Sequence, residues 1–327
     1  SIYLLMHDSF PHKDLADYLK LESYDGLVEF LKEQGFEIYN VYSIKDGTSI
    51  TMSSVFEISS SIPNDERSLG PIMVGDNRVN LLLQSKGYRT GMGRNSYFSQ
   101  DFPFLFYDFS LSDDISQDTI KSNDVLLAIL QGRLNSMLFT KTTGGHRTKG
   151  AAEFAAQQKN KDKILLWAWG GPGHTTTRLQ TMEQEFAHWK PRFELAVIDI
   201  MNEIKIISKN DDSSIIIIMS DHGPSLLRDK RSNDYGSDES KINSIHFRDQ
   251  YGAFMAIRWP DKKRAAKYDR DFQVDQDLFP IVFSYLYDSP IPLKYRITDT
   301  ALRIKDHKFD RGVFYPYFYK TNNKHTQ

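Results

Sequence analysis

The chain has 327 residues, of which 40% are hydrophobic and 26% are charged, and its formal net charge is −2. The near-neutral charge excludes a nucleic-acid binder that relies on bulk positive charge, and the absence of cysteine excludes a disulfide framework, a thiol nucleophile and a cysteine–zinc site. No apolar run approaches the roughly 18 residues of a membrane span, and the length allows one large α/β domain or two smaller ones.

Strands and helices alternate along the sequence. In chain order we predict a strand at 2–6, helix 24–34, strand 36–42, helices 49–58 and 80–86, strand 104–108, helix 122–134, strand 164–169, helix 192–208, strands 214–219 and 253–259, and helix 277–287. The polar, glycine-rich stretch 140–161 is interpreted as a surface loop, and the basic, aromatic tail from Lys305 is expected to wrap the surface. This alternation predicts an α/β fold with a mostly parallel central sheet and helices on both faces.

Acidic residues follow two of the apolar strands directly. His7 and Asp8 come after the strand at 2–6, and Ser220-Asp221-His222-Gly223-Pro224 follows the strand at 214–219. Parallel strands would bring Asp8 and Asp221 to the same edge of the sheet, where α/β proteins place their ligands. Two carboxylates and an imidazole suit a divalent metal. A turn residue or helix cap is the alternative for each acid alone, and the His7 side chain is expected on the opposite face of its strand.

A hydroxyl-rich segment begins the helix predicted at 49–58. Thr48 follows a Lys-Asp-Gly turn and lies at the helix N-terminus, where free backbone N–H groups and the helix dipole favour a phosphate. A metal bound to this hydroxyl would lower its pKa and make it nucleophilic. The alternative is a simple N-cap threonine, and Ser49 and Thr51 are rival hydroxyls.

Other polar residues are candidates for binding a phosphate. The glycine-rich turn at 170–173 follows the strand at 164–169 and would present His174 and free amides at the same edge. Arg178 and Arg248 could bind phosphate oxygens through two hydrogen bonds each, and surface salt bridges are the alternative for both. His246 could line the pocket or be a structural surface histidine.

The order and content of these motifs resemble the alkaline phosphatase superfamily, and within it the sulfatase-like branch of lipoteichoic acid synthases and phosphoethanolamine transferases. The resemblance runs from Ile2 to about Tyr287 and is most specific in Leu-Leu-Met-His-Asp, the Gly-Phe-Glu-Ile-Tyr-Asn segment from Gly35, and Ser-Asp-His-Gly-Pro. It implies an alkaline phosphatase-like fold, with a catalytic domain over 1–290 and a C-terminal extension over 291–327 that packs on or near it. It further implies one divalent metal held by Asp8, Thr48, Asp221 and His222, and a substrate phosphate contacted by His174.

Two departures from family patterns narrow the activity. Sulfatases need a Cys/Ser-x-Pro-x-Arg motif that matures to formylglycine, and the segment from Thr48 to Met52 has neither the proline nor the arginine, so a formylglycine sulfatase is not expected. The two-zinc phosphodiesterases have an aspartate where this chain has Gly170. We therefore expect a single metal ion, manganese, zinc or magnesium.

These features predict a metal-dependent phosphoryl-group transferase that acts on a phosphodiester, such as a phospholipid head group or a phospho-polymer unit, through a covalent phospho-threonine at Thr48. The alternatives are a phosphatase or phosphodiesterase of the same superfamily and a catalytically inactive binding module with this fold. A nucleotide-binding oxidoreductase is not favoured, because the Gly91-Met92-Gly93 stretch lacks the third glycine of the dinucleotide fingerprint.

The resemblance also sets expectations for partners and location. A phosphate-containing lipid or glycan substrate is expected, and nucleic acid is not; the oligomeric state stays open. Because the related enzymes carry membrane helices before the first strand, we expect a membrane connection through a segment missing from this chain. The chain begins abruptly inside a core strand, which fits a domain of a longer protein at the periplasmic or extracellular face of a bacterial cell envelope.

Overall fold

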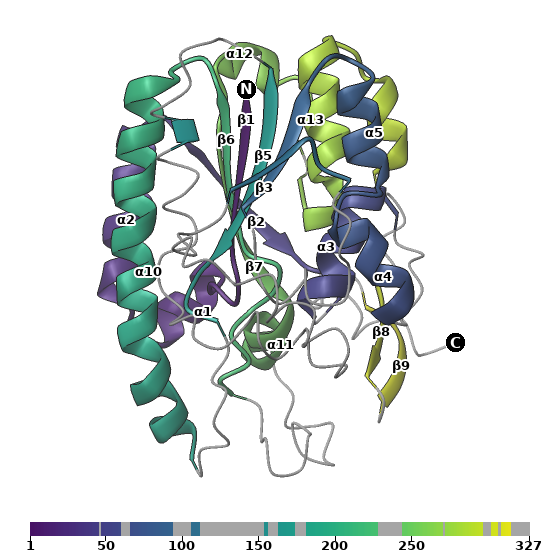
Figure 1. Cartoon of the computed structure of the whole chain (residues 1–327). Helices are drawn as coiled ribbons and strands as arrows, with labels where there is room; N and C mark the ends of the chain where they lie inside the picture. The colour runs from purple at the N-terminus through teal and green to yellow at the C-terminus, as the bar shows by residue number, and fades with distance from the viewer. Residues whose placement is uncertain are drawn as a thin grey trace, which may run out of the picture.

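The computed structural model describes residues 1–45, 47–59, 66–93, 106–111, 154–155, 163–173, 181–227, 244–270, 272–296, 302–306 and 309–314. A seven-stranded sheet with the order β2-β7-β6-β1-β5-β3-β4 forms the centre, and helices cover both of its faces (Figure 1). The strands are β1 (Ile2–His7), β2 (Glu37–Tyr42), β3 (Arg89–Gly93), β4 (Phe109–Leu111), β5 (Ile164–Gly170), β6 (Ile215–Met219) and β7 (Gly252–Arg258). The α/β class expected from the sequence is confirmed.

The helices of the described residues are α1 (Lys13–Tyr18), α2 (Glu22–Glu33), α3 (Thr48–Glu57), α4 (Glu66–Met73), α5 (Arg78–Gln84), α10 (Met182–Asn210), α11 (Ser244–Tyr251), α12 (Lys262–Ala265) and α13 (Leu278–Tyr287), with 3-10 turns η2 (Asp275–Asp277) and η3 (Ile291–Tyr295). A separate hairpin joins β8 (Leu302–Asp306) to β9 (Phe309–Phe314). No helix in the described ranges combines the length and apolar character that crossing a membrane requires.

The sheet is parallel in its centre and antiparallel at one edge. β1 runs parallel to β5 and β6 on either side, with Met6 opposite both Trp169 and Met219. β7 is antiparallel to β6 and to β2. The mostly parallel sheet is therefore as expected. The register brings the carboxyl ends of β1, β5 and β6 to one edge, which is the place where open α/β sheets bind ligands.

The side chains of β1 alternate between two helical layers. Ile2, Leu4 and Met6 belong to the core shared with α3, α5 and α13, whereas Tyr3 and Leu5 belong to the core shared with α2 and α10. All five are fully buried, and each buried large apolar side chain contributes about 1.5–3 kcal/mol. β1 is thus fixed in register from both faces, and so is the residue that follows it.

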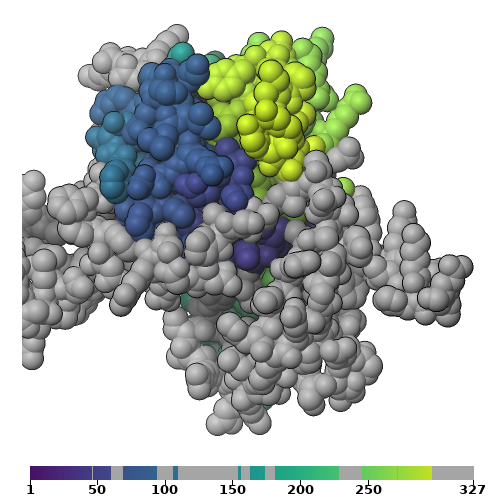
Figure 2. Space-filling model, turned by 90° about the vertical axis from the view of Figure 1, so that its right-hand side faces the viewer, coloured from purple at the N-terminus to yellow at the C-terminus, as the bar shows by residue number. Residues whose placement is uncertain are grey.

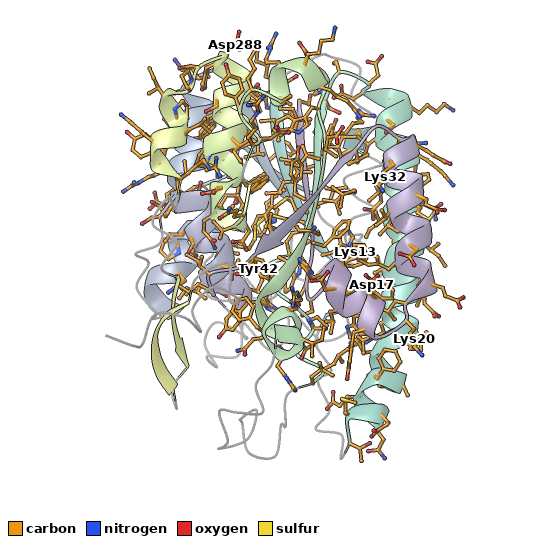
Figure 3. The ribbon with its side chains drawn as sticks, turned by 180° about the vertical axis from the view of Figure 1, so that it is seen from behind. Lys13, Asp17, Lys20, Lys32, Tyr42 and Asp288 are labelled. Atoms are coloured by element: carbon orange, nitrogen blue, oxygen red, sulfur yellow. The ribbon has the colours of Figure 1, made fainter. Side chains whose placement is uncertain are left out.

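The two helical layers are separated by the sheet. Figure 1 shows α2 and α10 on one side and α3, α4, α5 and α13 on the other. Figure 2 looks onto the second layer, where α4 and α5 lie beside the segment of α13 and η3. Figure 3 shows Tyr42, at the end of β2, and Lys13 of α1 far from Asp288, which follows α13 at the opposite end of the molecule. α13 therefore runs from η2, which is joined to the end of β2, toward that opposite end.

Helix α10 is much longer than the predicted helix 192–208. It starts after Thr181, whose side chain accepts a hydrogen bond from the Gln184 backbone while the Gln184 side chain accepts one from the Thr181 backbone. Pro191 lies inside the helix, one residue before the predicted start, although proline is more typical of a first helical position. The capping box and the burial of Trp189 and Phe193 on the sheet hold the extra turns in place.

Several other predictions differ from the structure or cannot be compared with it. The predicted strand 104–108 is displaced, since β4 starts at Phe109 and 106–108 is not strand, while 104–105 lies outside the described residues. The predicted helix 122–134 and nearly all of the predicted loop 140–161 also lie outside them. α1, α4, α11, α12, β3 and the hairpin of β8 and β9 were not predicted. The division into 1–290 and 291–327 stays a prediction.

Candidate metal centre

Asp8, Asp221 and His222 come together at the carboxyl ends of β1 and β6. One ligand atom from each lies within 4.8 Å of the others. His222 Nε2 is 3.1 Å from Asp221 Oδ2 and 4.0 Å from Asp8 Oδ1. All three residues are buried or nearly so, with exposed fractions of 9%, 0% and 1% respectively. Two residues separated by more than two hundred positions in the sequence thus share one small volume, as the strand-end argument predicts.

The imidazole of His222 is held in a defined orientation. Its Nδ1 lies 2.8 Å from the carbonyl oxygen of Gly223, so this nitrogen is assigned as the proton-bearing donor. Nε2 is then the lone-pair nitrogen of the neutral ring, and it is the one that faces the two carboxylates. A backbone carbonyl that fixes the tautomer in this way is the usual support of a metal-binding histidine.

Ser9 links the two carboxylates directly. Its hydroxyl donates to Asp8 Oδ1 at 2.7 Å, and its backbone N–H donates to Asp221 Oδ1 at 3.2 Å. Ser9 is fully buried and has a positive φ of 60°, a conformation that costs a non-glycine residue free energy and that is often retained at functional sites. Ser9 was not predicted as part of the site, although its position directly after Asp8 was a signal.

A glycine-rich turn closes around Asp8. The backbone N–H of Asp8 donates to Gly170 O at 2.9 Å, and that of Gly173 donates to Asp8 O at 3.2 Å. Gly171 has a φ of +111°, and a Cβ atom there would lie 2.7 Å from the Asp8 nitrogen, so the close approach requires glycine. Arg192 of α10 donates through Nη2 to Gly173 O at 3.3 Å. The turn is therefore fastened to both β1 and α10.

Burial is the main influence on the pKa values of Asp8 and His7. Burial raises the pKa of the Asp8 carboxyl, and the opposing effects of His222, the Ser9 hydroxyl and Arg192 are smaller. Burial also lowers the pKa of His7 to about 3, so this ring is neutral near pH 7. Burial makes it costly in free energy to ionise a carboxyl, and a bound cation removes this cost.

Thr48 is the first residue of α3, and the N-cap is Gly47, whose extended backbone precedes the helix. The interpretation of Thr48 as a simple N-cap is therefore wrong: the capping position belongs to a residue with no side chain, and the Thr48 hydroxyl is not used for it. Thr51 is fully buried, with its hydroxyl 3.0 Å from Ser43 Oγ. Ser49 is partly exposed. Of the two rival hydroxyls, only Ser49 keeps access from outside.

The remaining candidates fall into two groups. His174 and Arg178 lie outside the described residues, so their roles stay predictions. His246 is on α11 and partly buried, and burial lowers the pKa of its ring. Arg248, on the same helix, places Nε 2.5 Å from Asp14 Oδ2 of α1, the ion pair named as its alternative. Substrate binding by His246 or Arg248 stays a prediction.

Helix α11 also supports the segment after His222. The buried Asp249 carboxylate accepts hydrogen bonds from the backbone N–H groups of Leu226 and Leu227 at 2.9 and 2.7 Å. The Gly223 N–H donates to Gln250 O at 3.2 Å. This support was not predicted, because α11 itself was not recognised in the sequence.

The residues present fit a divalent metal ion. Two carboxylates and one imidazole nitrogen supply mixed oxygen and nitrogen donors, which suit zinc or manganese. With the proton on Nδ1, the lone pair of Nε2 is free to bind a metal on the side of the carboxylates. Ser9 and Gly223 supply the outer hydrogen bonds that such ligands need.

Comparisons with known proteins are informative at the level of structure. The sequence matches no protein-family model and no curated protein sequence. The fold is similar to the C-terminal periplasmic domain of EcEptC from Escherichia coli in complex with zinc, with a TM-score of 0.57 and 13% identity over 98% of this chain and 94% of that one.

Two further solved structures are similar. The soluble domain of lipooligosaccharide phosphoethanolamine transferase A from Neisseria meningitidis has a TM-score of 0.50 and 14% identity, covering 87% of this chain and 86% of that one. A protein in the alkaline phosphatase superfamily from Vibrio parahaemolyticus has a TM-score of 0.52 and 12% identity, covering 92% of this chain and 71% of that one. The chain thus has the alkaline phosphatase-like fold that the sequence motifs implied.

Proposed function

We propose that this protein is a metal-dependent phosphoryl-group transferase that acts on a phosphodiester and passes through a covalent phospho-threonine at Thr48. The observation that carries the proposal is the cluster of Asp8, Asp221 and His222, whose ligand atoms lie within 4.8 Å of one another at the carboxyl ends of two parallel strands. The fold supports it, because similar domains include a phosphoethanolamine transferase.

Asp8, Asp221 and His222 would hold one divalent ion together with the Thr48 hydroxyl. When bound, such an ion supplies positive charge that lowers the pKa of a hydroxyl and stabilises developing negative charge. Zinc and manganese are favoured over magnesium by the imidazole ligand, and a zinc complex is known for the similar domain of EcEptC.

The chain's own residues carry the transfer. The free backbone N–H groups at the start of α3 stabilise the phosphate oxygens. Thr48 Oγ gives its proton to solvent water and forms a bond to phosphorus while the bond from phosphorus to the leaving oxygen breaks. That oxygen takes up a proton, with His174 as the proposed donor. An acceptor hydroxyl then attacks the phospho-threonine and regenerates Thr48. With water as the acceptor, the same site is a hydrolase.

We also propose that the domain works at the periplasmic or extracellular face of a bacterial envelope and uses a phosphate-containing lipid or glycan. The similar domain of EcEptC is described as periplasmic. The integral membrane protein phosphoethanolamine transferase A from Neisseria meningitidis matches with a TM-score of 0.53 over 87% of this chain and 54% of that one. A lipid-borne donor requires this placement.

Trapping the intermediate tests the proposal. The zinc-loaded protein is incubated with a chromogenic phosphodiester, quenched in acid and digested, and the peptides are analysed by mass spectrometry. We expect release of the chromophore and a phosphodiester-linked adduct on Thr48. Ser49→Ala is the matched control and should keep the adduct. Turnover with the adduct on Ser49 would move the nucleophile, and no turnover with any phosphodiester would favour the inactive binding module.

A further inference from the structure

A group of buried polar side chains lies between the start of α3 and the η2 turn. Asp275 is fully buried and Gln276 is 1% exposed, both on η2. Across from them, Ser43 at the end of β2 and Thr51 of α3 are also fully buried. Apart from Thr51, considered above as a rival nucleophile, the proposed function gives none of them a role.

The backbone holds η2 firmly against the end of β2. The Tyr42 N–H donates to Gln273 O at 2.9 Å, and the Asp277 N–H donates to Val274 O at 3.0 Å. On the other side, the Ser43 N–H donates to Tyr251 O at 2.7 Å. The backbone of η2, and with it Asp275, is therefore fixed by hydrogen bonds to the end of β2.

Asp275 interacts electrostatically with Asp221 of the metal cluster, and its turn η2 packs against α3. The Ser43 hydroxyl lies beside its carboxyl, and the negative charge of Asp221 acts on it, whereas burial is the largest cause that raises its pKa. Ser43 Oγ is in turn 3.0 Å from Thr51 Oγ1, which donates to Lys45 O at 3.4 Å. The Ser43–Thr51 hydroxyl pair thus connects the surroundings of Asp275 to α3, the helix that begins at Thr48.

The next acid on the same turn is explained differently. Asp277 is also buried, but its carboxylate pairs with Arg296, with Nε 3.0 Å from Oδ2. Among the described residues, the Ser43 hydroxyl and the Gln276 backbone N–H act on the Asp275 carboxyl, and no cation pairs with it. A buried carboxyl without a cation costs stability, and such local costs are typical of functional sites.

We propose that Asp275 is a positioning residue: beside the Ser43–Thr51 hydroxyl pair and within the electrostatic influence of Asp221, its carboxyl sets the position of the first turn of α3, and so of Thr48, relative to the metal ligands. The proposal rests on the function proposed above. Asp275 acts through these neighbours and touches neither the metal nor the substrate.

The test compares Asp275→Leu and Asp275→Asn with Asp277→Asn in the full chain. Zinc affinity is measured by isothermal titration calorimetry, and kcat and KM with a chromogenic phosphodiester. We expect Asp275→Leu to lose about 10- to 100-fold in zinc affinity and in kcat with KM nearly unchanged, as groups that support metal ligands do. Asp275→Asn keeps the shape and a hydrogen-bonding amide, and should stay within about threefold of wild type.

The matched control is Asp277→Asn, an acid two residues away on the same turn. It breaks the pair with Arg296 and should lower the melting temperature without changing zinc affinity. Equal losses of affinity in Asp277→Asn and Asp275→Leu, or wild-type values in Asp275→Leu, would overturn the proposal.

A further variant covers a failure to fold. If Asp275→Leu does not fold, Ser43→Ala is tested instead. It should lower kcat about tenfold with KM unchanged. An unchanged kcat would overturn the proposal. A wild-type protein that binds zinc but turns over no phosphodiester would remove the proposed function alone, because the calorimetry would still show whether Asp275 supports the ligands.

Discussion

Polar clusters lie at both ends of β1 and β6, and the two clusters differ in how their charges are balanced. At the amino ends, the Tyr3 hydroxyl donates to Asp211 Oδ2 at 3.3 Å. Arg258 donates to Ser208 Oγ at 2.6 Å and to Asp211 O at 2.8 Å. Asp211 thus has a hydrogen-bond donor and a guanidinium as neighbours, so its negative charge is balanced within the protein.

The carboxyl ends of the same strands gather several carboxylates, and the Arg192 guanidinium acts on one of them, Asp8. Asp8 and Asp221 approach the same imidazole nitrogen, and Asp275 lies within the field of Asp221. The strands are equally well buried at both ends, so packing does not account for the difference. Like charges brought together in a buried place gain most from a cation, which is why we propose the metal site at this end of the strands.

The largest expected effect is at the proposed nucleophile. Thr48→Ala should lower kcat for a phosphodiester by more than about 1000-fold, because the attacking oxygen is removed. Because Gly47 and not Thr48 is the N-cap, the free energy of unfolding should change by less than about 0.5 kcal/mol. Steady-state kinetics and urea unfolding measure the two quantities. A variant with most of its activity left would end the covalent mechanism at Thr48.

A pair of matched substitutions contrasts the two strand ends. Asp221→Asn should weaken zinc binding by more than about 100-fold, beyond the range typical of groups that only support a ligand. Without metal it should be no less stable than wild type, since it relieves the repulsion with Asp8 and Asp275. Asp211→Asn, at the amino end, should leave zinc affinity unchanged. Isothermal titration calorimetry measures the zinc affinity of both variants. Equal zinc affinities would contradict the assignment of different roles to the two strand ends.

A pH effect arises beside the carboxyl end. Burial lowers the pKa of His12 from 6.5 to about 4, and its ring stacks on Tyr42 with centroids 5.3 Å apart. Below about pH 6.5 the His12 ring is protonated in the unfolded chain but stays neutral in the folded chain. The contribution of His12 to the free energy of unfolding is therefore fully present above pH 6.5 and is lost as the pH falls toward 4. One pKa unit is worth about 1.4 kcal/mol, so the loss is on the order of 3 kcal/mol.

His12→Gln isolates this contribution. Its unfolding free energy should fall less steeply than that of wild type between pH 6.5 and about 4, when both are followed by urea denaturation without metal. Parallel pH profiles for the two proteins would show that His12 is not the group responsible.

The smallest effect is expected at the structural end. Arg258→Met removes the donor to Ser208 and Asp211 but keeps the aliphatic stem, and should cost about 1–2 kcal/mol of unfolding free energy. Zinc affinity and kcat should not change. A loss of zinc affinity in this variant would mean that the two ends are coupled through the strands and are not independent.

The sequence predicted those parts of the site that depend on one segment at a time. Asp8 and Asp221 each follow a short apolar run, and parallel pairing was enough to bring them together. Ser9 and Asp275 were not predicted as parts of the site, because their roles depend on a positive φ and on the contact of η2 with β2, which no local pattern reports.

Strand direction and helix length were also beyond local patterns. The apolar sequence of β7 is compatible with either orientation in the sheet, and the structure shows that it pairs antiparallel with β6 and β2. In α10, Pro191 signals a helix start, and burial of Trp189 on the preceding turn overrides that signal. Tertiary packing decided both cases.

The central claim, that the carboxyl ends of β1 and β6 hold a divalent metal, is tested most directly by anomalous diffraction from crystals of the zinc-loaded protein. We predict one peak with Asp8, Asp221 and His222 Nε2 each within about 2.0–2.2 Å of it, as is usual for zinc. Under metal-replete conditions, no peak at this place, or a peak only at another site, would contradict the account.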